Sequence, residues 1–375
     1  MKVHSLNLYS LTIPFRRRFR HSSAVRAATG SVWVEAQGDQ GCGVGEGCPR
    51  TYVTGEDPDT ARSFFLRHRN ALTQSIRSLD DLTRWETDNR TEIDRNPAAW
   101  CSIELALLNL LALDEGISID RLLGESEPSG TFRYTAVVGD ETGDTLRDLI
   151  DRYVKQGFET FKIKLSGDRV RDLEKIQVMN DYGVDPSKAR VDANNLWEDS
   201  ADALAHICRL GTTFMGIEEP VRAGRFDMLR HIGEETGTPM ILDESLLTSD
   251  QIPDLSQDPQ SWIINIRVSK MGGLRRSLDV VRQATAAGIR IIVGAQVGET
   301  SILTRAGLIV AGAAESNLDG QEGAFGTLLL EHDICNPPLM FGASGVMDTT
   351  SWKFTDRPGW GLDVERPSRS LELLA

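Results

Sequence analysis

A short apolar run, a polar turn and an amphipathic segment recur in that order eight times from about residue 131 onward. The runs are rich in β-branched residues, and the segments between them place apolar residues at helical spacing, so strands and helices are predicted to alternate. Successive runs begin about 22 to 29 residues apart, which leaves room for one strand, one helix and two short loops. The runs read TFRYTAVVGD, TFKIKLSGD, ARVDANN, FMGIEEP, MILDES, WIINIRVSK, IRIIVGAQ and ESNLDGQ.

Eight such units predict an α/β fold with a (β/α)8-type barrel over residues 131–345. An open, doubly wound sheet is the alternative, because periodicity alone does not show that the sheet closes. Residues 1–130 differ: two strand-like stretches come first and two helical stretches follow, which predicts a separate α+β domain. Residues 346–375 are strand- and turn-like, and we expect them to return to that first domain.

The composition of the chain disfavours two classes of binding partner, nucleic acids and membranes. The 375-residue chain has a formal net charge of −14, which disfavours nucleic acid, because phosphate binding needs a basic surface. No apolar stretch approaches the roughly 18 residues of a membrane span. The N-terminus lacks the apolar segment of a signal peptide, so we expect a cytoplasmic protein without a membrane partner. Five widely spaced cysteines without a CxxC pair predict free thiols.

Carboxylates stand at the ends of three successive predicted strands, in the motifs VDAN, IEEP and LDES. The C-terminal ends of barrel strands meet at one rim, so these side chains are expected to gather there. Unpaired carboxylates would repel each other, and Mg²⁺, which prefers oxygen ligands, would relieve that repulsion. The three motifs hold no Cys or His, which disfavours zinc, whereas any one of them alone fits simple helix capping. The residues are Asp192 and Asn194, Glu218 and Glu219, and Asp243 and Glu244.

Lysines flank the predicted metal site in barrel order. Lys162 and Lys164 lie one residue apart on the second strand and therefore point to the same face. Lys270 ends the sixth strand, in SKMGG, and strands two and six lie on opposite sides of an eight-stranded ring. Lys164 and Lys270 are thus expected to face each other across the metal. Surface lysines and a phosphate clamp are alternatives, but the acids of DGQEG would repel phosphate.

The motifs KIK, VDAN, IEEP, LDES and SKMGG, in this order, resemble the enolase superfamily, within its muconate lactonizing enzyme subgroup. The resemblance covers essentially the whole chain and implies a modified barrel, a capping domain and a C-terminal segment that completes the capping domain. It implies that Asp192, Glu218 and Asp243 bind Mg²⁺, with Mn²⁺ as a possible substitute. It also implies that Lys164 and Lys270 are the acid/base pair and that the protein is a homo-oligomer, a dimer or an octamer.

The chemistry predicted for this site is removal of the proton next to a substrate carboxylate, with the metal stabilising the enediolate that forms. Lys162 is expected to lower the pKa of Lys164 or to bind the substrate carboxylate; pairing with a barrel carboxylate is the structural alternative. Two bases on opposite faces favour racemisation or epimerisation of an amino-acid derivative or related acid. Cycloisomerisation and syn-dehydration stay open, and a catalytically silent scaffold is disfavoured because all five catalytic positions are filled.

Two loops of the first domain are expected to set specificity, at residues 19–30 and 48–57. Their cationic and hydrogen-bonding groups suggest a substrate with a second carboxylate or another polar end, although an ordinary solvated arginine face is the alternative. The candidate contacts are Arg20, His21 and Arg26 in the first loop and Arg50 and Tyr52 in the second.

The last strands offer further candidates for substrate contact. Gln296 and Glu299 follow the seventh strand, and Arg267 on the sixth is expected in the layer behind the metal ligands. Dipeptide epimerases of the subgroup usually carry an Asp-x-Asp pair on the eighth strand, whereas here Asp319 and Glu322 stand three apart. A dipeptide substrate is therefore disfavoured, although PRTYVTGE resembles the dipeptide epimerases and QEGAFGTLLL is closer to muconate cycloisomerases.

Overall fold

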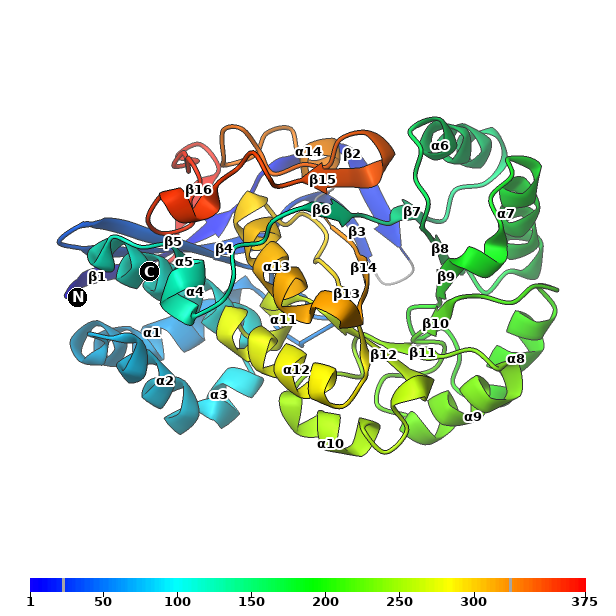
Figure 1. Cartoon of the computed structure of the whole chain (residues 1–375), viewed down its shortest axis with the longest axis horizontal. Coiled ribbons are helices and arrows are strands. Elements are labelled where there is room, and N and C mark those ends of the chain that lie inside the picture. Colours follow the sequence, from blue (N-terminus) through cyan, green and yellow to red (C-terminus); the bar gives the residue numbers. More distant parts are fainter. Residues whose placement is uncertain (22–23, 324–325) are drawn as a thin grey trace.

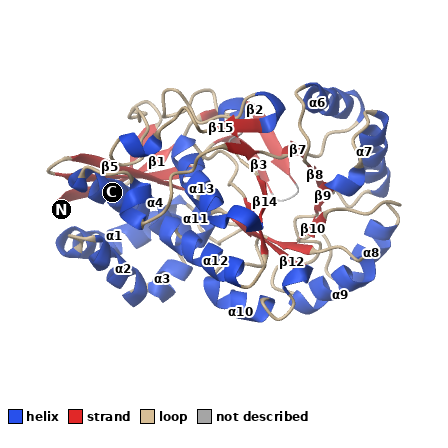
Figure 2. Cartoon of the chain, in the orientation of Figure 1, coloured by secondary structure: helices blue, strands red, loops and turns tan. Residues whose placement is uncertain are grey.

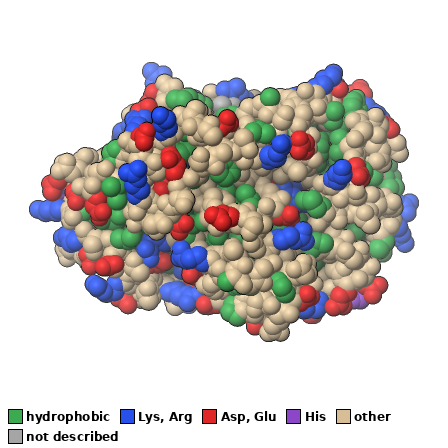
Figure 3. Space-filling view, in the orientation of Figure 1, with side chains coloured by type: hydrophobic (Ala, Val, Ile, Leu, Met, Phe, Trp, Pro, Cys, Tyr) green, Lys and Arg blue, Asp and Glu red, His purple; other side chains and the backbone are tan. Residues whose placement is uncertain are grey.

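The computed structural model describes residues 1–21, 24–323 and 326–375, with the side chains of residues 20–25 and 324–327 also outside the description. Two parts are visible in Figure 1: a sheet with helices that carries both chain ends, and a ring of strands surrounded by helices. On the face drawn in Figure 3, acidic and basic side chains are interspersed. Figure 2 shows that strands form the ring and that helices lie outside it.

The ring is a parallel sheet of eight strands that pair in chain order, from β7 to β14. It closes where Tyr134 bridges Gln321 in parallel fashion and the Thr135 amide donates to the Gln321 carbonyl at 2.9 Å. The barrel is therefore confirmed and the open-sheet alternative is wrong. The strands are β7 Ala136–Val138, β8 Phe161–Lys164, β9 Ala189–Asp192, β10 Gly216–Glu218, β11 Met240–Leu242, β12 Trp262–Ile266, β13 Arg290–Val293 and β14 Leu318–Gln321.

Helices cover the outside of the barrel, and several of them turn one apolar face inward. In α6, for example, Leu146, Leu149, Ile150 and Tyr153 are buried at helical spacing. The helices are α6 Gly143–Lys155, α7 Arg169–Asp181, α8 Ser200–Cys208, α9 Phe226–Thr236, α10 Ile252–Leu255, α11 Val268–Met271, α12 Leu274–Ala286, α13 Ser301–Ala314 and α14 Gly326–Leu329. Single 3-10 turns are η1 Pro186–Lys188, η2 Ser249–Gln251, η3 Pro259–Ser261, η4 Glu315–Asn317, η5 Ala343–Gly345 and η6 Phe354–Asp356.

Two of the predicted strands need correction. The first run divides into β7 and a separate strand, β6 (Thr131–Arg133), which pairs antiparallel with β15 (Val346–Asp348) outside the ring. The sixth strand ends at Ile266, so Lys270 lies in the short helix α11 and not on the strand. The left-handed Gly272, with φ 82°, ends that helix after one turn.

The first part of the chain forms an antiparallel sheet in the order β16-β1-β4-β5, with helices on it. The outermost strand, β16, comes from the C-terminal segment, as expected, while the domain limits at 130 and 345 stay a prediction. The strands are β1 Val3–Leu11, β4 Ser31–Gly38, β5 Gly41–Gly47 and β16 Leu371–Leu373, and the helices are α1 Pro58–Ser75, α2 Leu79–Asp88, α3 Arg90–Asp94, α4 Pro97–Glu115 and α5 Ile119–Leu123.

Helix α4 packs against β5 with its backbone almost touching the strand. A Cβ at Gly43, Gly45 or Gly47 would collide with carbonyl oxygens of α4, so only glycine allows this approach. By length and composition α4 could cross a membrane, but 89% of its apolar window is buried inside the protein, as in the core helix of a folded domain.

The stretch at 19–30, expected to be a loop, is largely a β-hairpin. Strand β2 (Pro14–His21) pairs antiparallel with β3 (Ala24–Ala28), and Phe19 aligns with Arg26. Alternation of basic, polar and apolar residues in this stretch fits a two-stranded ribbon as well as a loop. Residues 22–23 of the predicted loop, and the side chains of Arg20 and His21, lie outside the described part of the chain.

Candidate active site

A cavity of about 330 Å³ opens at the C-terminal ends of the barrel strands. Lys162, Lys164 and Arg267 line its barrel side, and Phe19 and Tyr52 from the first domain line the other. Both parts of the chain therefore contribute to one enclosure, as the prediction of specificity loops requires. Its wall also includes Asn194, Glu244, Gln296, Glu299 and Glu322 from the predicted set.

The three carboxylates predicted to bind metal lie on neighbouring strand ends. Asp192 of β9 and Glu218 of β10 are register partners, and Asp243 directly follows β11. All three side chains are buried. The ammonium of Lys162 lies between the first two, 3.0 Å from Asp192 Oδ2 and 2.7 Å from Glu218 Oε2, while Arg267 forms an ion pair with Asp243. Cationic side chains thus neutralise the acids that the sequence brings together.

The donor chemistry of these three residues suits a hard divalent cation, since all are buried carboxylates. Both oxygens of Glu218 lie within 2.8 Å of the Lys162 ammonium, so the middle carboxylate of the three stays charge-compensated in the absence of a metal. Among the described residues no three Asp, Glu, His or Cys side chains already form a metal-binding group. The residues therefore fit Mg²⁺ by type and burial, with Lys162 and Arg267 holding the carboxylates in this arrangement.

Lys162 and Lys164 project to the same side of β8, as strand alternation predicts, and both ammonium groups reach Asp192 Oδ2, at 3.0 and 2.6 Å. Lys164 also donates to Asn194 Oδ1 at 2.9 Å. Burial alone would lower the pKa of Lys162, but the carboxylates of Asp192, Glu218 and Glu322 outweigh burial and raise it. Lys162 is therefore a buried cation paired with barrel carboxylates, the arrangement considered above as the structural alternative.

Lys270 is fully buried and is not among the side chains that line the cavity. Its ammonium donates to Asp243 Oδ1 at 3.0 Å and to the carbonyls of Asp243 and Asn265 at 2.6 and 2.7 Å. Burial, the largest influence, lowers the pKa of Lys270. The two lysines thus do not face each other across open space here, because three oxygens hold Lys270 beside Asp243.

The other predicted wall residues form a connected polar layer. Arg267, expected behind the ligands, reaches the cavity itself and donates to Gln296 Oε1 at 3.1 Å. The backbone N–H of Gln296 donates to Glu299 Oε1 at 2.6 Å, and burial raises the pKa of Glu299 to about 8. Burial, reinforced by Asp243, also raises the pKa of Glu244 to about 7. Burial therefore favours the protonated form of these two acids, whereas Lys162 lowers the pKa of Glu322 in the same wall.

Arg50 does not point to the cavity, contrary to the prediction. Its guanidinium is fully buried and donates to the carbonyls of Thr29, Gly30, Pro49 and Val297 at 2.7 to 3.1 Å. Backbone carbonyls satisfy a buried arginine as well as a substrate carboxylate would, and their position cannot be read from the sequence alone. Arg50 therefore ties the first domain to the loop after β13.

Asp319 and Arg26 also differ from expectation, whereas Tyr52 does not. Asp319 lies 3.5 Å from Arg290 and outside the cavity wall, because it sits near the start of β14. Glu322, three residues further on, lies at the strand end and pairs with Lys162 at 3.1 Å. Arg26 is not part of the wall and lies over the Tyr52 ring at 5.9 Å, so it contacts a wall residue instead of the cavity.

Glu219, the second glutamate of IEEP, has a role that the sequence does not assign. Its φ of 38° turns the chain sharply after β10. Its carboxylate accepts from the Asp243 amide at 2.8 Å and from the amide and hydroxyl of Ser245 at 2.7 Å each. Glu219 thus fixes the backbone of the neighbouring strand end that presents Asp243. The doubled glutamate is the only signal for this in the sequence.

Comparison with known proteins agrees with this geometry. The enolase C-terminal domain-like family matches residues 145–368, more than half of the chain. The chain belongs to this family. The enolase-like resemblance inferred from the motifs is thereby confirmed.

Several relatives of this enolase-like chain have names that describe activity on amino-acid derivatives. It is 26% identical to the N-succinyl-L-Arg/Lys racemase of Bacillus cereus, over 83% of this chain and 84% of that protein. It superposes on a substrate-liganded L-Ala-D/L-Glu epimerase of Bacillus subtilis with a TM-score of 0.82 and 25% identity, covering 96% and 99% of the chains. A dipeptide epimerase of Methylococcus capsulatus, complexed with Mg and L-Arg-D-Lys, gives 0.79 and 25%, covering 97% and 100%.

Proposed function

We propose that this chain is a Mg²⁺-dependent racemase or epimerase that moves the α-proton of an amino-acid derivative. One observation carries the proposal: of the three neighbouring strand ends, each of the two outer carboxylates holds a lysine. Lys164 pairs with Asp192 on β9, and Lys270 pairs with Asp243 after β11. The two amines thus come from different elements and lie at opposite ends of the row of carboxylates, an arrangement that suits bases on opposite faces of one carbon. The relatives named above, a racemase and two epimerases, support the same reaction type.

Asp192, Glu218 and Asp243 would hold the Mg²⁺, which when bound stabilises the second negative charge that develops on the substrate carboxylate. Lys164 lines the cavity and removes or returns the α-proton on one face of the substrate. Lys270 does so on the other face, after exchanging its contacts with Asp243 for the substrate. The cationic Lys162 and Arg267 hold the substrate carboxylate against the wall.

The substrate class is proposed from the end of β14. An ammonium group on the substrate would need a carboxylate there, but Asp319 is turned to Arg290, and Glu322 is paired with Lys162 and Arg190. An amino acid whose nitrogen is acylated needs no such partner. We therefore favour N-acyl amino acids over compounds with a free amino group.

A dipeptide is the second candidate, and Glu141 favours it. This residue, which sequence analysis did not single out, lines the cavity beyond β7, and its Oε2 is buried without a hydrogen-bond partner in the described structure. A peptide ammonium that reached this oxygen would satisfy it. Glu141→Gln would then weaken binding of dipeptides and leave N-acyl amino acids unaffected.

Exchange of the α-proton in D₂O, followed by NMR, tests the proposal. The panel contains both enantiomers of N-succinyl and N-acetyl amino acids, and dipeptides, each with Mg²⁺ and with EDTA. We expect exchange that EDTA abolishes and that Lys164→Ala or Lys270→Ala reduces by about three orders of magnitude or more. Undiminished exchange in both variants would contradict the two-base mechanism, and full activity in EDTA would contradict the metal.

The proposal also covers the identity of the metal ion, the oligomeric state and the cellular compartment. We propose that Mg²⁺ is replaceable by Mn²⁺ at the same carboxylates, since both take oxygen ligands in octahedral geometry. We further propose a homo-oligomer, a dimer or an octamer, in the cytoplasm. Restoring the EDTA-treated protein with each ion tests the first point, and light scattering after size-exclusion chromatography tests the second.

A further inference from the structure

The helix that carries Lys270 is held by the first domain. The backbone amide of Cys48 donates to the Ser269 hydroxyl at 2.7 Å, and both groups are buried. Ser269 is the residue before Lys270, and Cys48 opens the 48–57 loop that supplies Tyr52 to the cavity. One hydrogen bond therefore joins the wall that meets the substrate to the helix that presents a base.

A second contact fixes the chain just after that helix, at the start of α12. The carboxylate of Glu104, on α4, accepts from the amides of Leu274 and Arg275 at 2.9 and 2.8 Å, at the first turn of α12. It lies so close to Gly273 that a Cβ there would collide with it. Glu104 is fully buried, so no water competes for these amides. The chain from Lys270 into α12 is thus clamped by a residue of the first domain.

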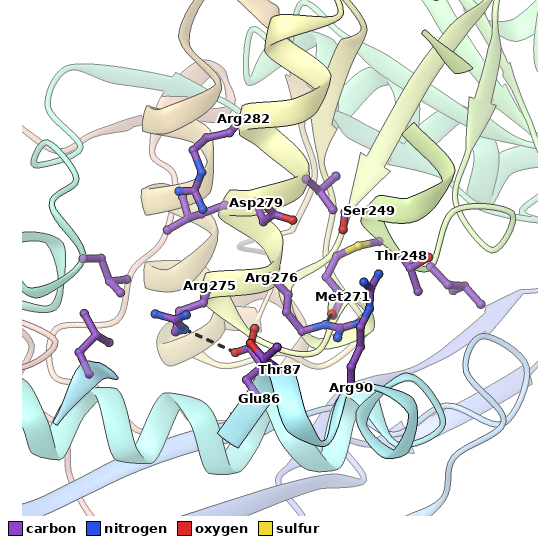
Figure 4. Close-up of a pocket in the computed structure, with 15 residues that line it drawn as sticks. Glu86, Thr87, Arg90, Thr248, Ser249, Met271, Arg275, Arg276, Asp279 and Arg282 are labelled. Carbon is purple, nitrogen blue, oxygen red and sulfur yellow. Dashed lines mark hydrogen bonds and ion pairs between the residues drawn. The ribbon is translucent and has the colours of Figure 1, made fainter. Parts of the chain in front are cut away.

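The chain that joins α11 to α12 is not packed against other residues on every side. A second cavity, of about 340 Å³, lies between α2 and α12, and its wall includes Met271, next to Lys270. In Figure 4, Arg275 points from α12 toward Glu86 of α2 across this space, where Nε lies 3.4 Å from the carboxylate. Because the junction borders a cavity, the hydrogen bonds of Ser269 and Glu104 matter more for the position of Lys270.

Lys164 is supported by a different set of residues, all from the barrel. The ammonium of Lys175, on α7, is fully buried and donates to the Lys164 carbonyl at 2.7 Å. It also lies 3.2 Å from Asp172 Oδ1. A buried ammonium needs such partners, and here one of them is the backbone of the residue proposed as a base.

Asp172 extends this support to the chain after β8. Its carboxylate accepts from the amides of Ser166 and Gly167 at 2.9 to 3.1 Å, from the Ser166 hydroxyl at 2.8 Å, and lies 3.0 Å from Nε2 of His206 on α8. The backbone on the C-terminal side of Lys164 is therefore fixed by two helices. Neither helix belongs to the first domain.

We propose that the two lysines are aligned by two independent networks of positioning residues: Ser269 and Glu104 for Lys270, and Lys175 and Asp172 for Lys164. This inference rests on the proposed function, in which each lysine serves one face of the substrate. Weakening one network then slows proton removal from one enantiomer and spares the other. The first domain, which binds the substrate, thereby controls one base and not the other.

The test measures initial α-proton exchange in D₂O separately for each enantiomer of an accepted N-acyl amino acid. Ser269→Ala and Glu104→Gln are expected to change the ratio of the two rates about tenfold in one direction, and Lys175→Met and Asp172→Asn about tenfold in the other. Asp120→Asn is the matched control, because Asp120 on α5 is also a buried carboxylate, pairs with Arg305 of α13 and belongs to neither network. It should leave the ratio unchanged.

Equal slowing of both enantiomers by all four variants would overturn the inference and show a general loss of structure. If Lys164→Ala and Lys270→Ala themselves show no preference between enantiomers, the two-base function fails instead. Amide hydrogen exchange then still tests whether the two networks are independent. Ser269→Ala should loosen residues 268–273 alone, and Lys175→Met residues 164–168 alone; loosening of both segments by either variant would overturn the proposed independence.

Discussion

Lys162 Nζ, within β8, lies 2.8 Å from Oε1 of Glu218 at the end of β10, and both side chains are buried. The lysine is in contact with Asp192 as well, so one ammonium offsets two carboxylates of the proposed metal site. A bound Mg²⁺ and this lysine therefore act on the same negative charge. The stabilisation that a bound metal gives to the folded protein should therefore depend on the charge of Lys162.

Lys162→Met should destabilise the metal-free protein by about 3–5 kcal/mol, because it leaves buried carboxylates without a partner. Mg²⁺ should restore a larger part of the stability in the variant than it adds to the wild type. Denaturant unfolding in EDTA and in Mg²⁺ measures both effects. Lys155→Met, which removes an exposed ion pair with Asp151, is the control and should change little. Equal effects of Mg²⁺ on variant and wild type would contradict the coupling.

Glu104 should make folding stability depend on pH. Burial, with Glu86 nearby, raises its pKa to about 8, above the ordinary value of 4.5. The folded state therefore holds this proton more tightly, so its contribution is fully present below about pH 4.5 and is lost as the pH rises through about 8.

Glu104→Gln, which does not titrate, should remove this dependence. Between pH 5 and pH 9 the unfolding free energy of the wild type should fall relative to the variant by roughly 3 kcal/mol. Urea unfolding across this range checks it, with the exposed Glu234→Gln as control. Parallel profiles for wild type and Glu104→Gln would show that the buried carboxyl does not titrate in this range.

Arg50→Ala should lower stability by roughly 3 kcal/mol or more, because several buried carbonyls lose their donor. Arg50→Lys should recover part of the loss, since one ammonium reaches fewer carbonyls than a guanidinium. Thermal unfolding of the three proteins measures the order. If Arg50→Ala instead weakens only substrate binding, Arg50 faces the substrate after all.

Gly45→Ala should cost about 3 kcal/mol or more, because the new Cβ would meet the Ser102 carbonyl of α4. Gly312→Ala is the matched control: it lies within α13, and its Cβ would find nothing closer than 3.8 Å. That substitution should be neutral or stabilise by about 0.5–1 kcal/mol through helix propensity. The difference in unfolding free energy between the two variants decides whether the close approach of α4 to β5 is essential.

The spacing of apolar runs predicted the barrel because most of its strands are buried on both faces, although β14 is only partly buried, and helices such as α6 are buried on one. Strand ends then indicated where Asp192, Glu218 and Asp243 would meet, since parallel strands bring their C-terminal ends to one rim. Residues whose partners are backbone groups escaped prediction. Arg50 binds carbonyls and Glu219 binds amides, and such partners leave no pattern in the side-chain sequence.

Lys270 shows a second limit. Its motif was found, but β12 ends earlier than the apolar run, and the Gly pair allows one helical turn in place of more strand. Whether a lysine at such a place faces a cavity or is held by three oxygens depends on tertiary contacts, here with Asp243 and Asn265.

The pairing of β1 with β16 has a consequence for biosynthesis. One edge of the β1 strand stays uncovered until residues 371–373 have left the ribosome, by which time the entire barrel has been made. An uncovered strand edge invites pairing with other chains. The barrel is therefore free to fold first, and the sheet of β1, β4 and β5 gains β16 only after every barrel strand has been made.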